Sequence, residues 1–528
     1  MNFRTWLEEK ATINGNAPYI YHENKIISYK ETDLMANKAA NLFKNLGVTK
    51  GDKCTIILNN SPDYLFIWFG LAKIGAVAAC LNRFLKGEGL RHLINCSDST
   101  VVVIDAELKD AYEAIESGLS KVKHVIWYPD VPEGRKSKDC SFTKLFQLAL
   151  DDKPPITDIK KGDPMAFLHT GGTTGLPKWC ILSHNCYIAL GKKIADFFCL
   201  TSRDRVLNPL PLFHLNPQGF YVMGALAGNA SIVMIDRFSA SAFWDQVQGY
   251  AVTVLILHVG IVDILKARPF HEKENSHSVR LGYRVDAEFM ERFNIPEGIV
   301  GYGSTEAAGL THMNRYRMPL TVEEKKLSRL SSSCGQPRSD IEIMIANDDD
   351  EAVPVNEMGE ILVRPREPYV MFDGYYSSPE KTVEAFRNLW YHSGDIGFLD
   401  EKGGLHFVQR KGDSIRVRGE WVFVSEVEDV IRLHPNVEDC AVVGVMGDVG
   451  GEEIKAVIEP KPGKTISELE IIVHCEDKLA YFMLPRYIEV IDELPRTDAA
   501  GRIQKAELKK SGIARAWDRD ATGYKIKK

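Results

Sequence analysis

The segment Met165-Ala-Phe-Leu-His-Thr-Gly-Gly-Thr-Thr-Gly-Leu-Pro-Lys178 carries the strongest local signal in the chain. Its first five residues are mostly apolar and follow polar, proline-containing stretches at residues 151–155 and 160–164, so they predict a buried strand. Residues 170–178 then combine unobstructed backbone amides, hydroxyl donors and one cation, which are the groups that bind a polyphosphate. We therefore expect a phosphate-binding loop directly after a strand.

This loop differs from the Walker A sequence of P-loop proteins. Its lysine follows Pro177 instead of glycine, and Trp179 stands where a Ser or Thr would follow the lysine. A kinase or P-loop ATPase is therefore not favoured. Loops rich in Gly and Thr also occur as ordinary turns, so the loop alone leaves both interpretations open.

The sequence around the loop predicts an α/β protein with two domains. Helical periodicity at residues 33–46 alternates with short apolar runs at 54–58 and 101–104, which is typical of a sheet packed between helices. A chain of 528 residues exceeds what one hydrophobic core usually supports. Because residues 409–413 are polar and flexible in composition, we expect a large N-terminal domain over 1–412 and a small mobile α+β domain over 413–528.

The composition excludes several classes of partner. With a net charge of -7, 45% hydrophobic and 26% charged residues, the chain resembles an ordinary soluble protein and offers no basis for nucleic-acid or anionic-membrane binding. The N-terminus lacks the features of a secretory signal, and no apolar run is long enough to span a bilayer. The ten cysteines form no CxxC pair and are expected to be reduced. We predict a cytoplasmic protein without integral membrane contact; a homo-oligomer is left open.

Six further segments share an order along the chain that is characteristic of one group of enzymes. They are Pro211-Leu-Phe-His214, Gly301-Tyr-Gly-Ser-Thr-Glu306, Gly335-Gln-Pro337, Gly359-Glu360, Trp390-Tyr-His-Ser-Gly-Asp395 and Arg410-Lys-Gly-Asp413. Together with the loop they resemble the adenylate-forming superfamily of acyl-CoA synthetases, luciferase and peptide-synthetase adenylation domains. Two segments, Arg237 to Val247 and Phe213 to Gln218, look like those of bacterial carnitine and crotonobetaine CoA ligases.

The resemblance implies a reaction in two steps. A carboxylate attacks the α-phosphate of MgATP to give an acyl-adenylate and pyrophosphate, and the thiol of coenzyme A then displaces AMP. The implied cofactors are ATP, Mg²⁺ and coenzyme A, and the implied partners are CoA and a small or medium carboxylic acid, with a betaine as the first candidate.

The resemblance also assigns roles to the residues that match the motifs. Hydroxyls and a lysine suit phosphate oxygens, a carboxylate suits Mg²⁺, and an aromatic ring suits adenine. The residues implied in catalysis are Thr174, Lys178, Glu306, Arg502 and Lys505, with Glu306 also the metal ligand. Those implied in cofactor binding are Thr170, Gly171, Gly172, Thr173, Gly175, Tyr302, Gly303, Thr305, Asp395, Arg410 and, for CoA, Gly419. His214, Gln218, Ala307 and Gly309 are implied in the acyl pocket, and Asp413 is the implied hinge.

Some of these residues have ordinary structural interpretations. His214 suits a core histidine in a turn as well as a gate of the acyl pocket. The aromatic residues Phe213, Phe220 and Tyr221 would attract a quaternary ammonium through their ring faces, but they also suit a hydrophobic core.

The chain departs from the superfamily at several positions. Arg502 stands where the family has the lysine that bridges carboxylate and α-phosphate, and arginine is not an equivalent replacement. We hypothesise that Arg502 fills the role in part, with Lys505 as the substitute.

Residues 281–286 differ from the Gly-Gly-Ala-like stretch beside adenine, and Trp179, Gln409 and Trp421 are unusual. Two alternatives therefore stay open: an adenylating enzyme with a carrier-protein acceptor or another acid class, and a nucleotide-binding homologue with reduced or lost turnover.

Overall fold

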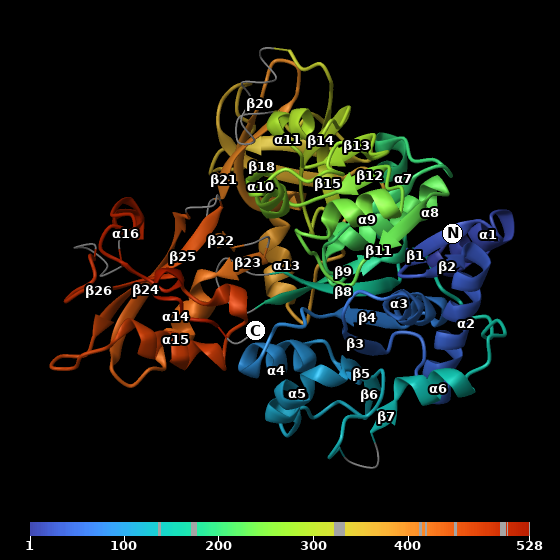
Figure 1. The fold of residues 1–528 in the computed structure, drawn as a ribbon, viewed down its shortest axis with the longest axis horizontal. Helices are drawn as coiled ribbons and strands as arrows, with labels where there is room; N and C mark the ends of the chain where they lie inside the picture. Colours follow the sequence, from blue (N-terminus) through green and yellow to red (C-terminus); the bar gives the residue numbers. More distant parts are fainter. Residues whose placement is uncertain are drawn as a thin grey trace.

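A computed structural model describes residues 1–135, 139–170, 177–321, 333–410, 414–417, 420–447, 451–496, 503 and 505–526 (Figure 1). It confirms a mixed α/β protein with a large N-terminal domain and a small C-terminal domain. The small domain, drawn in orange to red on the left of Figure 1, projects from the large one. No helix among the described residues has both the length and the apolar character needed to cross a membrane.

The first large sheet contains the strand predicted before the loop. The predicted strand at residues 165–169 is confirmed as β8, which pairs in parallel with β4 and antiparallel with β9. In spatial order the sheet consists of β19 (Tyr375–Tyr376), β9 (Lys178–Ser183), β8 (Pro164–Thr170), β4 (Val77–Cys80), β3 (Lys53–Ile57), β5 (Ser99–Asp105), β6 (His124–Tyr128) and β7 (Cys140–Ser141). Three helices connect strands of this sheet along the chain: α4 (Gly87–Cys96), α5 (Lys109–Glu116) and α6 (Phe142–Leu148).

The second large sheet has a parallel centre and antiparallel strand pairing at both edges. Its order is β16 (Gln336–Pro337), β15 (Gly309–Arg317), β14 (Glu297–Ser304), β13 (Leu281–Tyr283), β12 (Val254–Ile256), β10 (Arg205–Leu207), β11 (Ser231–Met234), β1 (Pro18–His22) and β2 (Lys25–Ser28). Helices α8 (Gly224–Gly228), α9 (Phe243–Gly249), α10 (Val259–Ala267) and α11 (Ala287–Arg292) connect these strands. One core joins both sheets to α1 (Phe3–Ile13), α2 (Tyr29–Asn45), α3 (Pro62–Ile74) and α7 (His184–Phe198).

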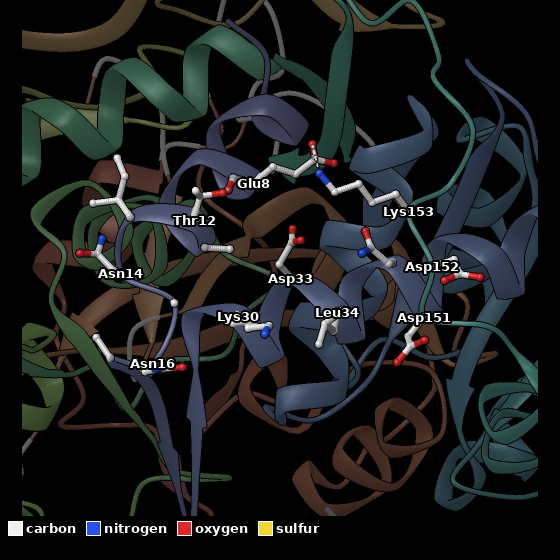
Figure 2. Close-up of a pocket in the computed structure, with 15 residues that line it drawn as sticks. Glu8, Thr12, Asn14, Asn16, Lys30, Asp33, Leu34, Asp151, Asp152 and Lys153 are labelled. Atoms are coloured by element: carbon white, nitrogen blue, oxygen red, sulfur yellow. Dashed lines mark hydrogen bonds and ion pairs between the residues drawn. The ribbon is translucent and has the colours of Figure 1, made fainter.

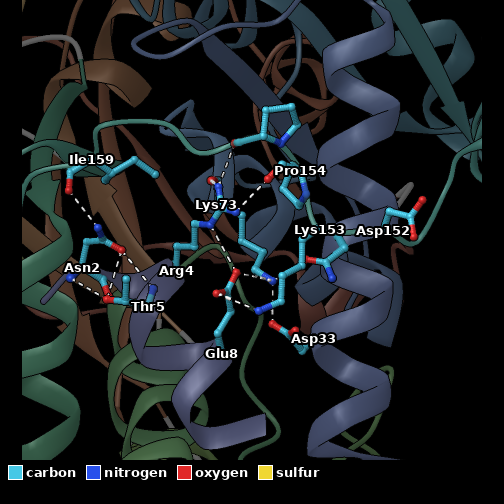
Figure 3. Close-up of polar contacts among 12 residues, drawn as sticks. Asn2, Arg4, Thr5, Glu8, Asp33, Lys73, Asp152, Lys153, Pro154 and Ile159 are labelled. Carbon is cyan, nitrogen blue, oxygen red and sulfur yellow. Dashed lines mark hydrogen bonds and ion pairs between the residues drawn. The ribbon is translucent and has the colours of Figure 1, made fainter. Parts of the chain in front are cut away.

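Helix α3 is enclosed by this core, since every residue from Tyr64 to Ile74 is buried. Its last turn contains Lys73, which has no exposed side-chain surface and is 2.6 Å from Asp33 of α2 (Figure 3). Burial lowers the pKa of Lys73, while Asp33 opposes that shift. A polar depression of about 1000 Å³ lies beside this ion pair, between α1, α2 and residues 151–153 (Figure 2).

The rest of the large domain is a four-stranded antiparallel sheet. It contains β17 (Ile341–Ala346), β18 (Gly359–Pro365), β20 (Tyr391–Leu399) and β21 (Leu405–Arg410), and helix α13 (Pro379–Ala385) precedes β20.

The small domain has its own hydrophobic core, whose buried side chains run from Ile415 to Ile488. It begins with the hairpin of β22 (Ser414–Val417) and β23 (Glu420–Phe423). A second sheet follows, with β24 (Val437–Met446), β25 (Glu452–Pro460), β26 (Tyr487–Val490) and β27 (Trp517–Asp518), and α14 (Val424–Arg432), α15 (Glu468–Glu476) and α16 (Lys505–Lys510) complete the α+β fold. All ten cysteines of the chain are unbridged.

Candidate functional site

The site lies where strands of the two large sheets end. Strand β8 ends at Thr170, the start of the predicted phosphate loop, and β14 ends at Ser304, just before Thr305 and Glu306. Ligands of α/β proteins bind at such carboxyl ends. Within the predicted loop, Gly171, Gly172, Thr173, Thr174 and Gly175 lie outside the described residues.

Lys178 returns from the loop as the first residue of β9, opposite Thr170 in the strand register. Its ammonium lies 4.9 Å from the ring centroid of Tyr375, and the Tyr375 hydroxyl donates a hydrogen bond of 3.1 Å to Oε1 of Glu306. Burial and then Lys381 lower the pKa of Lys178, while Glu384 and Glu306 act in the opposite direction. The fold therefore brings a lysine and a glutamate that are distant in sequence into one cluster.

The donor set of Glu306 suits a hard cation. Tyr375 engages one carboxylate oxygen, and the other has no hydrogen-bond or ion-pair partner among the described residues. The Glu306 carbonyl accepts a hydrogen bond of 3.0 Å from the backbone N–H of Phe372, which fixes the main chain. A half-buried carboxylate with one available oxygen is an appropriate ligand for Mg²⁺.

Trp179, an unusual residue beside the loop lysine, is directed away from this cluster. Successive side chains of a strand point to opposite faces, and Trp179 is 1% exposed with its indole donating to the Leu93 carbonyl at 3.0 Å. It is a core residue under α4 and does not obstruct Lys178.

Tyr302 and Asp395, predicted for adenine and ribose, are in direct contact. The Tyr302 hydroxyl donates to Oδ2 of Asp395 at 2.6 Å, and the Tyr302 ring stacks on Phe407 with centroids 5.8 Å apart. Asp395 lies opposite Arg410 in the register of β20 and β21, although the Arg410 side chain is outside the described set. The sequence motifs thus identified two residues that form one polar corner.

Gly303 and Gly309 occupy positions where a side chain does not fit. A Cβ at Gly303 would lie 1.9 Å from the Gly309 carbonyl oxygen, so the strands approach too closely for any other residue. Gly309 has φ +90°, and a Cβ there would lie 2.9 Å from the Phe220 ring. These contacts, with buried Ala307 alongside, show that the backbone is closely packed where the sequence predicts the acyl pocket.

Aromatic side chains pack close to Gly309. Phe220 meets Tyr283 edge to face with centroids 5.6 Å apart, and Phe213, Phe220 and Tyr221 are all buried. Gln218 is fully buried too, and its amide is occupied by Tyr187 and by the Leu212 carbonyl. The described side chains thus agree with the core interpretation of the aromatic residues, and the Gln218 amide is engaged within that core.

His214 connects the large domain to the small domain. Its Nε2 lies 3.0 Å from a carboxylate oxygen of Glu420 on β23, a contact that no sequence pattern indicated.

Arg284, in the stretch that departs from the superfamily, has φ +60° and donates from Nε to the Tyr283 hydroxyl at 3.1 Å.

The C-terminal candidates are only partly described. Lys505 forms an ion pair of 2.7 Å with Glu428 of α14, so its ammonium is engaged inside the small domain. Arg502, Asp413 and Gly419 lie outside the described residues.

Comparisons with known proteins agree along the whole chain. The family model described as AMP-binding enzyme matches residues 7–376, and that of the AMP-binding enzyme C-terminal domain matches residues 426–500. A crotonobetaine/carnitine–CoA ligase of Escherichia coli is 31% identical over 494 residues, covering 91% of this chain and 93% of the relative.

Solved structures share the fold. The o-succinylbenzoate CoA synthetase of Bacillus subtilis aligns with a TM-score of 0.80 at 23% identity, covering 97% of this chain and 99% of the other. The amide bond synthetase of Marinactinospora thermotolerans aligns with a TM-score of 0.81 at 21% identity and the same coverage.

Proposed function

Because the chain belongs to the AMP-binding enzyme family, we propose that it is an ATP-dependent acyl-CoA ligase that activates a small or medium carboxylic acid as its adenylate. One observation carries this proposal: Glu306 follows the end of β14, the strand that holds Tyr302 against Asp395, and Tyr375 contacts both Glu306 and Lys178. Tyr302 and Glu306 are only four residues apart, which suits one nucleotide that extends from base to phosphates.

In the first step a carboxylate oxygen of the acid bonds to the α-phosphorus of ATP, and the bond to the β-phosphate breaks with its electron pair leaving on pyrophosphate. Lys178 offers a positive charge to the departing group, and Tyr302 and Asp395 orient the nucleoside. Mg²⁺ at Glu306 would neutralise phosphate charge. In the second step the CoA thiol releases its proton to solvent, its sulfur bonds to the acyl carbon, and the carbon–oxygen bond to AMP breaks with its electron pair leaving on AMP.

We place the domain boundary at residues 412 and 413, with Asp413 as the hinge between two poses of the small domain. The present pose brings Glu420 of the β22–β23 hairpin to His214. We assign this pose to the CoA step, because Lys505 is paired with Glu428 inside the small domain, and we assign adenylation to a second pose reached by rotation of that domain. ATP and CoA as substrates and unbridged cysteines suit a cytoplasmic enzyme.

A panel of acids tests the function and the substrate together. The relative named for crotonobetaine and carnitine makes a betaine the first candidate, and the close packing around Gly303 and Gly309 favours a short acid. We expect AMP release to require both CoA and a small acid in the panel. Preference for long-chain fatty acids would contradict the substrate, AMP release without dependence on CoA would contradict the acceptor, and ATP binding without turnover on any acid would contradict the enzyme.

A further inference from the structure

We propose that Tyr375 is a positioning residue for adenylation: its hydroxyl orients the metal-binding carboxylate of Glu306, and its ring supports the ammonium of Lys178. The inference deepens the proposed function and rests on it. It is carried by two contacts of one side chain, 3.1 Å to Oε1 of Glu306 and 4.9 Å from the ring centroid to Lys178 Nζ.

Strand pairing explains how Tyr375 reaches both partners. The two-residue strand β19 pairs with β9 so that Tyr375 lies opposite Cys180, two residues after Lys178. The Ile181 N–H donates to the Gly374 carbonyl at 3.0 Å, and the Tyr375 N–H donates to the Thr382 hydroxyl of α13 at 2.9 Å. The backbone of Tyr375 is therefore held from both sides.

The turn before Tyr375 is compatible only with glycine. Gly374 has φ +120°, and a Cβ there would lie 2.6 Å from Cγ2 of Thr382. This close approach allows α13 to hold the start of β19, and thereby fixes where the Tyr375 ring stands.

The same segment controls both the main chain and the side chain of Glu306. Phe372 donates its N–H to the Glu306 carbonyl, and Tyr375 donates its hydroxyl to one carboxylate oxygen. Hydrogen bonds to a ligating carboxylate select its orientation and present the remaining oxygen to a metal. The Tyr375 ring also presents its negative face to Lys178. This contact holds the Lys178 ammonium close to Glu306, at the part of the site proposed for the phosphates, before nucleotide binds.

Tyr376 provides a matched control on the same strand. Its side chain lies on the opposite face, where its hydroxyl donates to Asp98 at 2.9 Å and its ring packs on Phe167 at 4.6 Å. It has the same chemistry and a comparable hydrogen bond, but in the described part of the chain it contacts neither Lys178 nor Glu306.

The test compares Tyr375→Phe with Tyr376→Phe in the full-length protein. Mn²⁺ is titrated by electron paramagnetic resonance in the presence of a non-hydrolysable ATP analogue, which reports metal affinity without turnover. We expect Tyr375→Phe to weaken Mn²⁺ binding by about tenfold, because an orienting partner of a metal ligand is lost, and Tyr376→Phe to leave it unchanged. The half-saturating Mg²⁺ concentration for pyrophosphate exchange should rise in parallel, with the rate recovered at high Mg²⁺.

A second variant separates the ring from the hydroxyl. Tyr375→Leu removes both, and it should bind the ATP analogue several-fold more weakly than Tyr375→Phe because Lys178 loses its support. Wild-type Mn²⁺ affinity in Tyr375→Phe, or an equal loss in Tyr376→Phe, overturns the orienting role, and equal analogue affinity in Tyr375→Leu and Tyr375→Phe overturns the ring contact. If wild-type protein turned over no acid, the proposed function would fail, while the Mn²⁺ titration would still decide the role of Tyr375.

Discussion

Asp395 is a buried carboxylate whose charge is directed at the candidate nucleoside corner. Its Oδ2 accepts the Tyr302 hydroxyl at 2.6 Å. Replacement by Asn keeps the shape and an acceptor for Tyr302 but removes the charge that would strengthen hydrogen bonds from ribose hydroxyls. We expect Asp395→Asn to raise the KM for ATP by about tenfold, equivalent to about 1.4 kcal/mol, with a smaller effect on the KM for the acid.

Steady-state kinetics with ATP as the varied substrate measures this change. Asp400→Asn is the control, because Asp400 lies in the same β20–β21 hairpin but binds His406 at 3.0 Å. An unchanged KM for ATP in Asp395→Asn, or the same increase in both variants, would remove Asp395 from the nucleoside site.

The residues of the site differ in how far the sequence could indicate them. Lys178, Glu306 and Asp395 stand in motifs whose chemistry is recognisable from residue type and order. Tyr375 and Glu420 were not predicted, because their contacts depend on a two-residue strand pairing and on the pose of the small domain. Neither a two-residue strand pairing nor the pose of a domain produces a local pattern in the sequence.

At the scale of elements, the packing of α1, α2 and α3 depends on a charged group in the core. Lys73 of α3 is fully buried and reaches Asp33 and Asn37 of α2 and, at 3.6 Å, Glu8 of α1 (Figure 3). Removing one partner of a buried pair leaves the other uncompensated. We expect Lys73→Met to lower the free energy of unfolding by about 3 kcal/mol, and Lys73→Met with Asp33→Leu to recover much of the loss.

Chemical denaturation followed by tryptophan fluorescence measures both changes. Lys50→Met serves as the control, since Lys50 and Asp163 form a more exposed pair at 2.7 Å that should contribute less than about 1 kcal/mol. A loss in Lys73→Met no larger than in Lys50→Met would show that the buried charge does not hold these helices together.

Longer elements were predictable and the shortest were not. The periodic helix at residues 33–46 is α2 with a different start, and the apolar runs at 54–58 and 101–104 are β3 and β5 within a few residues. Strands β16, β19 and β27 have only two residues each, too few for a period. Their positions follow from the neighbours that pair with them.

At the scale of the whole molecule, several contacts between described residues join the two domains. Phe84 of the large domain meets Tyr481 of the small one edge to face at 4.9 Å, and His214 pairs with Glu420. A third contact places Glu426 of α14 beside α4, where its Oε1 lies 3.1 Å from the position of a Cβ at Gly89. The third contact buries a carboxyl group against the other domain and makes the pose sensitive to pH.

Burial, with Asp429 adding to it, raises the pKa of Glu426 from 4.5 to about 7 in this pose. In this pose Glu426 binds its proton more tightly than it does when the domains are separated. The stability of the domain contact is therefore greatest below pH 4.5 and falls as the pH rises toward about 7. Above about 7 the free-energy cost of the ionised carboxylate no longer changes with pH. We therefore expect the domains to separate more at pH 8 than at pH 6. Glu426→Gln cannot ionise and should keep the same arrangement at both values.

Small-angle X-ray scattering of the full chain measures this difference as a change in radius of gyration. The His214–Glu420 pair is present in wild type and in Glu426→Gln, so the two proteins differ only at residue 426. A larger radius at pH 8 in wild type alone would assign the pH dependence to Glu426. Equal changes in both proteins would assign it to another group, and no change in either would mean that the buried carboxyl does not limit the domain contact. Since the CoA step is proposed for this pose, the first result also predicts that thioester formation slows relative to pyrophosphate exchange as the pH rises from 6 to 8.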